Sequence, residues 1–214
     1  MTGLSRKNPL YLITDTGSSG LSHAAMARQA VRAGIGTIQL RDKEMSKRAL
    51  YKEALVIRQI TRRHGALFIV NDHIDIALAA DADGVHLGQD DMPAEEARRI
   101  MGKRKIIGIS THSLGQALKA QDAGADYIGF GPMFHTSTKD AGRPKGTKML
   151  SRIRGSINIP IVAIGGITWE NVSEVLSAGA DSCAVASGIL SGNIKANAKK
   201  FFRAIEQQIE SAQA

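Results

Sequence analysis

The stretch Leu114-Gly-Gln-Ala-Leu-Lys-Ala-Gln-Asp-Ala-Gly-Ala-Asp-Tyr-Ile-Gly-Phe130 contains a predicted helix, a turn and a predicted strand, in that order. Residues 114–123 have an amphipathic pattern, and residues 127–130 form a short apolar run. Ala123-Gly124 fits the end of the helix, where glycine accepts a left-handed backbone conformation. The same turn precedes three further apolar runs, at Ala33-Gly34, Ala82-Asp83-Gly84 and Ala178-Gly179. This repeat indicates one structural unit that is used several times along the chain.

Short apolar, β-branched runs alternate with amphipathic segments over most of the chain. The runs are residues 11–14, 37–40, 67–70, 84–87, 106–109, 127–130, 161–164 and 182–186. Helical patterns cover residues 46–63, 94–101, 114–123, 170–178 and 195–209. A spacing of about 24 residues between runs is close to one strand-plus-helix unit of a barrel. We therefore predict a single-domain α/β protein, a closed (β/α)8 TIM barrel over residues 1–214, rather than an open doubly wound sheet.

The composition is that of a folded domain with an excess of positive charge. With 214 residues, 43% of them hydrophobic, the chain can bury a core without disulfides, and disorder is excluded. We expect no membrane association, because no apolar run approaches the roughly 20 residues that span a bilayer and no signal peptide is recognisable. The single Cys183 predicts a reducing, cytoplasmic location.

A net charge of +8 favours anionic partners, either nucleic acid or phosphorylated metabolites. Basic clusters lie at residues 58–64, 98–105 and 195–200, on or just after predicted helices and without interleaved aromatic residues. We interpret them as solvated helix faces, which disfavours nucleic acid as a partner. Small phosphorylated molecules are the partners that we expect.

In a barrel of this type, chemistry is placed at the C-terminal ends of the strands. Gln39, Arg41 and Lys43 follow the second predicted strand and, as alternate residues, can share one face. An amide donor, a planar guanidinium and a point charge on one face make a clamp for a polyphosphate. The alternative is a strand end with charges that face solvent.

Acidic residues follow the next two predicted strands. Asn71-Asp72 ends one strand, and Asp90 and Asp91 follow the next. Carboxylates beside a cationic clamp are useful when they hold a hard cation, and Mg2+ binds through one or two carboxylates plus substrate phosphates. Helix capping by Asp72 or Asp91 is the alternative, because aspartate is a good N-cap residue. No Cys/His cluster with zinc spacing is present in the sequence.

Three further strand ends carry polar or glycine residues. Ser110 can donate a hydrogen bond to a phosphate or leaving-group oxygen, whereas His112 has no neighbouring carboxylate in the sequence to orient it as a base. Residues 131–146 form a long loop of Gly, Pro, hydroxyl and basic residues, whose composition is typical of a phosphate-binding flap; an idle surface loop is the alternative. Gly165-Gly166 and Ser187-Gly188 end the last two strands, where many barrels bind a phosphate. Two anion sites at one barrel mouth suggest a transferase that joins two phosphorylated molecules.

Seven motifs in order make the chain resemble the thiamine phosphate synthase family, over residues 10–190. The motifs are Tyr11-Leu-Ile-Thr-Asp15, Gln39-Leu-Arg-Asp-Lys43, Asn71-Asp72, Gly84-Val-His-Leu-Gly-Gln-Asp-Asp91, Gly108-Ile-Ser-Thr-His112, Gly131-Pro-Met-Phe-His-Thr-Ser-Thr-Lys139 and Ala163-Ile-Gly-Gly-Ile167. The resemblance implies a transferase of thiamine biosynthesis. Such an enzyme condenses 4-amino-2-methyl-5-hydroxymethylpyrimidine diphosphate with a thiazole phosphate, giving thiamine phosphate and pyrophosphate.

The resemblance also implies a role for each site residue. Contacts to the pyrimidine diphosphate are implied for Gln39, Arg41, Lys43, Asn71, Ser110 and Lys139, with Arg41, Ser110 and Lys139 catalytic. Contacts to the thiazole phosphate are implied for Thr136, Thr138, Gly166, Ala186 and Ser187. Mg2+ is implied at Asp72 and Asp91, with Asp90 the weaker candidate. The family is also compatible with a homodimer.

Two other functions are considered. A TenI-like thiazole tautomerase shares the barrel and the phosphate pocket but transfers a proton, and it needs neither the paired acids Asp72 and Asp91 nor the cationic clamp. A basic nucleic-acid-binding protein requires a continuous cationic face with stacking aromatics, and the chain is only 4% aromatic. Both are less favoured than the synthase.

Overall fold

The computed structural model describes residues 9–136 and 142–213, and in them eight parallel strands close into one barrel. The strands are β1 (Leu10–Ile13), β2 (Thr37–Leu40), β3 (Leu67–Asn71), β4 (Gly84–Leu87), β5 (Ile106–Thr111), β6 (Tyr127–Phe130), β7 (Ile161–Ile164) and β8 (Ser182–Val185). Residues 10–12 of β1 pair with residues 183–185 of β8, which closes the sheet. The predicted (β/α)8 fold is confirmed. The assignment of all 214 residues to one domain stays a prediction.

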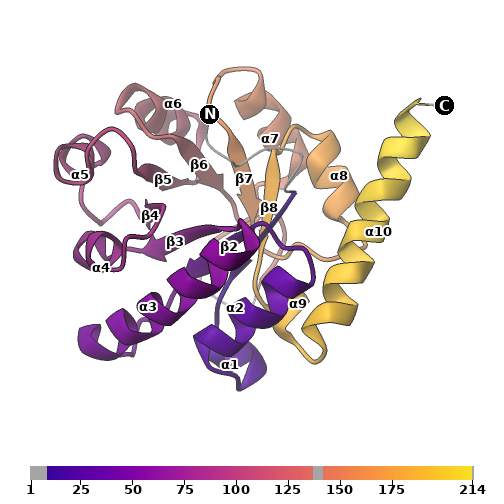
Figure 1. Ribbon diagram of the computed structural model, residues 1–214. Coiled ribbons are helices and arrows are strands. Elements are labelled where there is room, and N and C mark those ends of the chain that lie inside the picture. The colour runs from indigo at the N-terminus through magenta and orange to yellow at the C-terminus, as the bar shows by residue number, and fades with distance from the viewer. Residues whose placement is uncertain (1–8, 137–141, 214) are drawn as a thin grey trace.

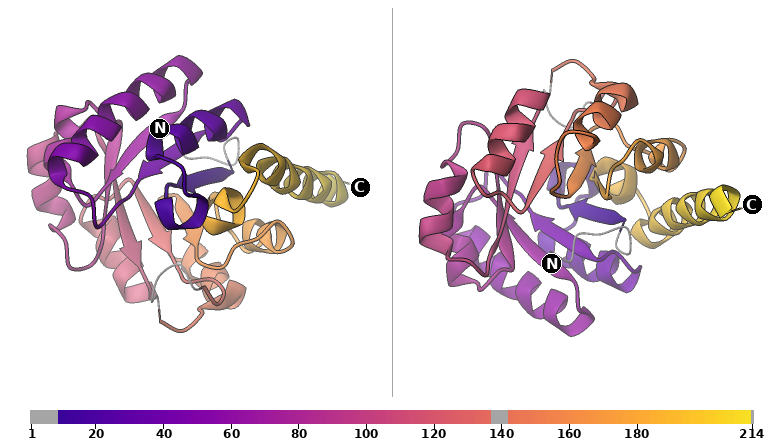
Figure 2. Two further views of the ribbon diagram at one scale, coloured as in Figure 1. Left: turned by 90° about the horizontal axis from the view of Figure 1, so that it is seen from below. Right: turned by 90° about the horizontal axis from the view of Figure 1, so that it is seen from above.

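Helices surround the strands on the outside of the barrel, as Figures 1 and 2 show. They are α1 (Thr16–Ser19), α2 (His23–Arg32), α3 (Lys47–His64), α4 (Ile74–Ala79), α5 (Ala94–Met101), α6 (Leu114–Asp122), α7 (Gly146–Arg154), α8 (Val172–Ser177), α9 (Ser187–Leu190) and α10 (Ile194–Gln213). The long α10 packs on α2, α8 and α9 and projects beyond the barrel (Figure 2). Within the described ranges, no helix is long and apolar enough to cross a membrane.

Side-chain alternation along the strands divides the core into two parts. Outward-facing residues such as Leu12, Ile38 and Phe68 pack against the helices in one large cluster. Inward-facing residues form a smaller cluster inside the barrel, which includes Tyr11 and Tyr127. The barrel interior is therefore filled by side chains and is not a channel. Functional groups lie above this filling, at the strand ends.

The Ala-Gly turns precede β2, β6 and β8 and, with the turn before β4, recur every two strand-plus-helix units. Gly34, Gly124 and Gly179 have φ angles of 94°, 79° and 112°, which is the left-handed conformation predicted for them. Each turn follows the end of a helix and leads directly to the next strand. The repeat thus divides the barrel into quarters.

The turn before β4 differs from this prediction. Gly84 does not end a helix; it is the first residue of β4, and Asp81 takes the left-handed position with a φ of 50°. A Cβ atom on Gly84 would lie 2.2 Å from the carbonyl oxygen of Ile106 in the neighbouring strand. Glycine is needed here because two strands approach closely, and not because a helix turns.

Ion pairs repeat with the same two-unit period at the N-terminal ends of the strands. We call them the arginine–aspartate clasps: Arg58–Asp83, Arg98–Asp126 and Arg154–Asp181. In each clasp, the carboxylate oxygen that meets the arginine also accepts a backbone N–H from the preceding strand. These backbone donors are Phe68 at 2.8 Å, Ile107 at 2.7 Å and Ile161 at 2.9 Å, respectively. A helix, a strand and the next turn therefore meet at one oxygen atom.

The clasps predict a stability contribution that can be measured at Asp126. Asp126→Ala leaves the Ile107 N–H and the Arg98 guanidinium without their shared acceptor, and both groups are partly buried. We expect the free energy of unfolding in urea to fall by about 1–3 kcal/mol. The exposed Asp122→Ala, on the preceding helix, is the control and should change it by less than about 0.5 kcal/mol. Equal losses for the two variants would contradict the role of the clasp.

Candidate active site

Two adjoining cavities open at the C-terminal ends of the strands. One has a volume of about 390 Å³ and lies over β1, β7 and β8, and the other has a volume of about 350 Å³ and lies over β2, β3 and β4. Arg41, Ser110 and His112 line both cavities. These three residues therefore form a shared wall between the two cavities. We call the cavity over β1, β7 and β8 the apolar cavity and the cavity over β2, β3 and β4 the polar cavity.

The polar cavity collects most of the residues predicted for the diphosphate and the metal. It is lined by Arg41, Lys43, Asn71, Asp72, Asp91 and Ser110, together with Gly88, Gln89, Asp90, His112 and Gln116. Gln39 is not among the residues that line either cavity. It lies one layer deeper in the barrel with 3% of its surface exposed, and its amide nitrogen donates to the Tyr11 hydroxyl at 2.7 Å. The alternation of side chains thus places Arg41 and Lys43 at the mouth, and Gln39 below them.

Asp72 and Asp91 face each other across the ends of β3 and β4. Asp72 has a left-handed φ of 61°, and its N–H donates to the His86 carbonyl at 2.9 Å. Asp91 accepts the Gly88 N–H at 2.6 Å. Burial raises the pKa of the Asp72 carboxyl, and the hydrogen bond and negative charge of Asp91 raise it further. The positive charges of Lys43 and His73 oppose this rise in the pKa of Asp72.

Helix capping does not explain these two acids. The N-cap residue of α4 is His73 and that of α5 is Pro93, so neither Asp72 nor Asp91 takes that position. Asp91 instead closes a tight turn within its own loop through Gly88. A non-glycine residue in the left-handed region, as at Asp72, is uncommon and is found more often where a site needs it. The capping alternative is therefore wrong for both residues.

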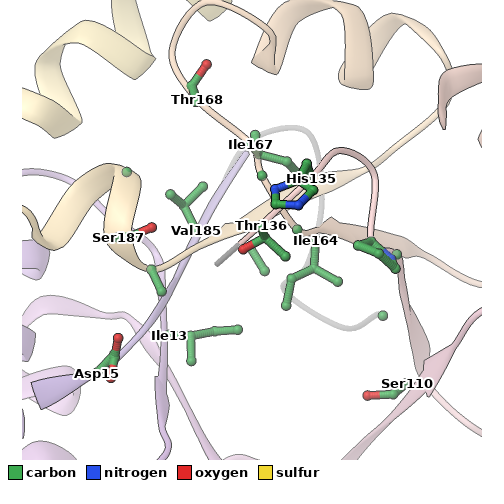
Figure 3. Close-up of a pocket in the computed structure, with 18 of the residues that line it drawn as sticks. Ile13, Asp15, Ser110, His135, Thr136, Ile164, Ile167, Thr168, Val185 and Ser187 are labelled. Carbon is green, nitrogen blue, oxygen red and sulfur yellow. The ribbon is translucent and has the colours of Figure 1, made fainter. Parts of the chain in front are cut away.

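The apolar cavity collects the residues predicted for the thiazole phosphate. Ile13, Ile164, Ile167 and Val185 supply its hydrocarbon walls, and Thr136, Gly166, Ala186 and Ser187 also line it. Figure 3 shows Ser187 and Ser110 on opposite sides of this space, with Asp15 below Ser187. Thr138 and Lys139 lie outside the described residues. Asp15 lines the cavity as well, although the sequence did not indicate a ligand role for it.

The glycines at the end of β7 have a packing function that the sequence did not predict. Gly165 and Gly166 have φ angles of 99° and 65°, and a Cβ atom on Gly166 would lie 2.4 Å from the His135 carbonyl oxygen. The Met133 N–H donates to the Ile164 carbonyl at 2.8 Å. The first part of the loop after β6 is thus held against the end of β7. Small residues at 165 and 166 make this approach possible, besides lining the cavity.

His112 in the shared wall is oriented by the backbone. Its Nδ1 lies 2.7 Å from the Gly131 carbonyl oxygen, which can only accept a hydrogen bond. Nδ1 therefore carries a proton, and the ring is held between the ends of β5 and β6. Sequence reasoning looked for an orienting carboxylate beside His112, and the structure provides a carbonyl group 19 residues away instead.

A buried histidine that the sequence analysis did not single out anchors the cationic segment. His23 is 1% exposed; its Nδ1 lies 2.7 Å from the Thr14 hydroxyl and its Nε2 lies 3.0 Å from Asp42. Burial alone raises the pKa of Asp42, but hydrogen bonds from His23 and from two backbone N–H groups outweigh burial and bring the pKa below its usual range. The Thr14 hydroxyl also accepts the N–H of Arg41 at 3.3 Å. This His23 brace fixes the backbone between Arg41 and Lys43.

Fold and site together define a class of protein. A (β/α)8 barrel with cations and paired carboxylates beside an apolar cavity, all at the strand C-termini, is a barrel enzyme built for phosphorylated small molecules. Comparison with known proteins then identifies the family. Residues 10–189 match the family model described as thiamine monophosphate synthase. This chain belongs to the thiamine monophosphate synthase family.

Individual relatives agree along nearly the whole chain. A thiamine-phosphate synthase of Chloroflexus aurantiacus is 48% identical over 198 residues, covering 92% of this chain and 91% of the relative. The thiamine-phosphate synthase of Methanosarcina barkeri is 44% identical over 213 residues, covering 96% of each. The solved structure of thiamine phosphate pyrophosphorylase from Pyrococcus furiosus superposes with a TM-score of 0.87 at 40% identity, covering 95% of this chain and 98% of that one.

The His23 brace predicts a large stability loss on truncation. His23→Ala removes a buried ring and takes one hydrogen bond each from the Thr14 hydroxyl and the Asp42 carboxylate. We expect the free energy of unfolding in urea to fall by about 2–4 kcal/mol. His64 is exposed and its ring bonds to the Ile60 carbonyl of its own helix, so His64→Ala should cost less than about 0.5 kcal/mol. If the two variants unfold alike, the brace does not stabilise this segment.

Proposed function

We propose that this chain is a thiamine phosphate synthase. It condenses 4-amino-2-methyl-5-hydroxymethylpyrimidine diphosphate with 4-methyl-5-(2-phosphoethyl)thiazole, or with the carboxylated form of that thiazole, and releases pyrophosphate. The observation that carries this proposal is the pair of adjoining cavities with the shared wall of Arg41, Ser110 and His112. A charged space beside an apolar space suits a diphosphate that must leave next to a heterocycle that must attack. Family membership supports the same reaction.

The polar cavity is assigned to the diphosphate. Arg41 and Lys43 supply positive charge to its oxygens, and Asn71 and Ser110 supply hydrogen bonds. Asp72 and Asp91 are the ligands that we assign to Mg2+, because two facing carboxylates at the cavity fit a hard cation that takes its other ligands from water and substrate. When bound, Mg2+ supplies charge neutralisation to the leaving pyrophosphate. Lys139, outside the described residues, stays a predicted catalytic residue.

The apolar cavity is assigned to the thiazole phosphate. Thr136 and Ser187 offer hydroxyl groups at its rim, and Gly166 and Ala186 leave room there. Thr138 stays a predicted contact. Ile13, Ile164 and Val185 exclude water from the space in which the thiazole ring would lie. Holding the second substrate in a dry cavity beside the first supplies orientation and protects the reactive species.

The reaction that we propose proceeds by loss of the leaving group before attack. Pyrophosphate departs from the pyrimidine methylene group, the aminopyrimidine ring stabilises the resulting cation by resonance, and the thiazole nitrogen captures it. Carbon–oxygen cleavage precedes carbon–nitrogen bond formation, and no general base is required. The residues of the polar cavity stabilise the negative charge that develops on the leaving group, which is the step where electrostatic stabilisation matters most.

We also propose that the protein acts in the cytoplasm. Two soluble phosphorylated substrates and one buried cysteine, Cys183, suit the cytoplasm. We assign neither nucleic acid nor membrane as a partner, and a homodimer stays a prediction.

Product formation with and without Mg2+ tests the function directly. Purified protein mixed with both substrates should release pyrophosphate and thiamine phosphate in equal amounts, and chelation of Mg2+ should abolish both products. Asp91→Asn should lower kcat/KM by about 100-fold and raise the Mg2+ requirement without changing the melting curve, because it removes one ligand charge. The neighbouring Asp90→Asn should lower it by less than about fivefold. Thiazole isomerisation without pyrophosphate release would instead indicate the TenI-like tautomerase.

The two-site assignment is tested at Ser187. Ser187→Ala removes one hydroxyl from the apolar cavity and none from the polar cavity, so it should raise the KM for the thiazole phosphate about tenfold. The KM for the pyrimidine diphosphate should stay within twofold of the original value, as measured by steady-state kinetics with each substrate varied. The exposed Ser191→Ala, four residues further on, is the control. An equal rise in both KM values contradicts the assignment.

A further inference from the structure

A chain of four hydrogen bonds crosses the inside of the barrel from Gln39 to Ser110. The Gln39 amide nitrogen donates to the Tyr11 hydroxyl at 2.7 Å, and the Tyr11 and Tyr127 hydroxyls are 3.0 Å apart. The Tyr127 hydroxyl lies 2.9 Å from His86 Nδ1, and His86 Nε2 lies 2.9 Å from the Ser110 hydroxyl. The two ends are predicted substrate contacts. The three residues between them line neither cavity, and no role has been assigned to them above.

Glycine residues on two neighbouring strands, β5 and β6, leave room for this chain of hydrogen bonds. A Cβ atom on Gly108 would lie 2.1 Å from the ring of Tyr127, and a Cβ atom on Gly129 would lie 2.9 Å from the ring of His86. Glycine inside a strand weakens the strand and is typical of places where another group must approach closely. The interior is therefore shaped around the rings of Tyr127 and His86.

The chemistry of its members gives the chain a direction. Both tyrosines are fully buried, and burial raises the pKa of each hydroxyl, so each keeps its one proton. With the Gln39 amide as first donor, the Tyr11 hydroxyl donates a hydrogen bond to Tyr127, and the Tyr127 hydroxyl donates one to His86 Nδ1. His86 then carries its proton on Nε2 and donates to Ser110. The hydroxyl proton of Ser110 is left to point into the cavities that Ser110 lines.

We propose that Tyr11, Tyr127 and His86 are positioning residues for the transfer reaction. They fix the orientation of the Gln39 amide at one end and of the Ser110 hydroxyl at the other. Ser110 can then donate a hydrogen bond to the departing diphosphate. The chain therefore links Gln39 on β2, which lies below the cavities, to Ser110 on β5, which lines both of them. This inference rests on the proposed function for the identity of the substrate, and on the hydrogen bonds alone for the orientation.

A double-mutant cycle measures the coupling in the proposed reaction. Tyr127→Phe keeps the ring but breaks two of the four bonds, and it should lower kcat at least about tenfold while the KM for the thiazole phosphate stays within about twofold. Combined with Ser110→Ala, the total loss of kcat should be at least about fivefold smaller than the product of the two single losses. Losses that simply multiply overturn the proposal. Tyr11→Phe repeats the cycle at the next bond if Tyr127→Phe folds poorly.

Thr37→Val is the matched control for the loss of a buried hydroxyl. Thr37 lies two residues before Gln39 on the same inward face of β2, is fully buried, and its hydroxyl has no hydrogen-bond partner among the described residues. This variant should keep kcat within about twofold. A loss as large as that of Tyr127→Phe would show that barrel packing, and not the chain, sets the rate.

The protonation state of His86 tests the chain without any assay of activity. Nitrogen NMR of the histidine rings should show His86 neutral with its proton on Nε2 in the unaltered protein. This preference for Nε2 should weaken in Tyr127→Phe, because Nδ1 then loses the hydrogen bond from the Tyr127 hydroxyl. A proton on Nδ1 in the unaltered protein overturns the direction proposed for the chain, whatever reaction the enzyme catalyses. Absence of thiamine phosphate with the Nε2 form intact overturns the proposed function instead.

Discussion

The barrel depends on the arginine–aspartate clasps at its N-terminal end. Its strands are only four to six residues long, so each strand contributes few backbone hydrogen bonds of its own. In a clasp, one oxygen of Asp83, Asp126 or Asp181 accepts both a guanidinium and a strand N–H, which ties helix to sheet where the strands begin. Gly36 stands immediately before β2, where the other three quarters have aspartate. The end of the barrel opposite the two cavities thus has its own repeated contact between helix, strand and turn.

Charges at the opposite end are arranged differently. At the N-terminal end each clasp aspartate has an arginine within 3.0 Å, so its charge is neutralised inside the protein. At the C-terminal end, Asp72 and Asp91 face each other and the pKa of Asp72 is raised. Arg41 and Lys43 line the same cavity, and the His23 brace fixes the backbone between them. Charges of both signs therefore line one cavity, which suits the metal diphosphate that we propose as its ligand.

Much of this arrangement could be predicted from the sequence, because it follows from local patterns. The β-branched runs placed all eight strands, and alternation along β2 placed Arg41 and Lys43 at the mouth. What could not be predicted depends on contacts between residues far apart in the chain. Tyr11 and Tyr127 are 116 residues apart, and a tyrosine in an apolar strand has the same local pattern whether or not its hydroxyl is bonded. The depth of Gln39 and the brace at His23 were missed for the same reason.

The shared wall explains why two cavities serve better than one. A cation formed in open water is captured by water, so the attacking nitrogen must already be in contact when the leaving group departs. Arg41 and Ser110 border both spaces, so in the proposed reaction the charge that develops on pyrophosphate would be stabilised at the boundary with the space assigned to the thiazole ring. The apolar residues Ile13, Ile164 and Val185 keep water from the other side of that boundary. The wall would thus supply charge stabilisation and the apolar side chains exclusion of solvent, and the buried hydrogen-bond chain from Gln39 reaches the wall at Ser110.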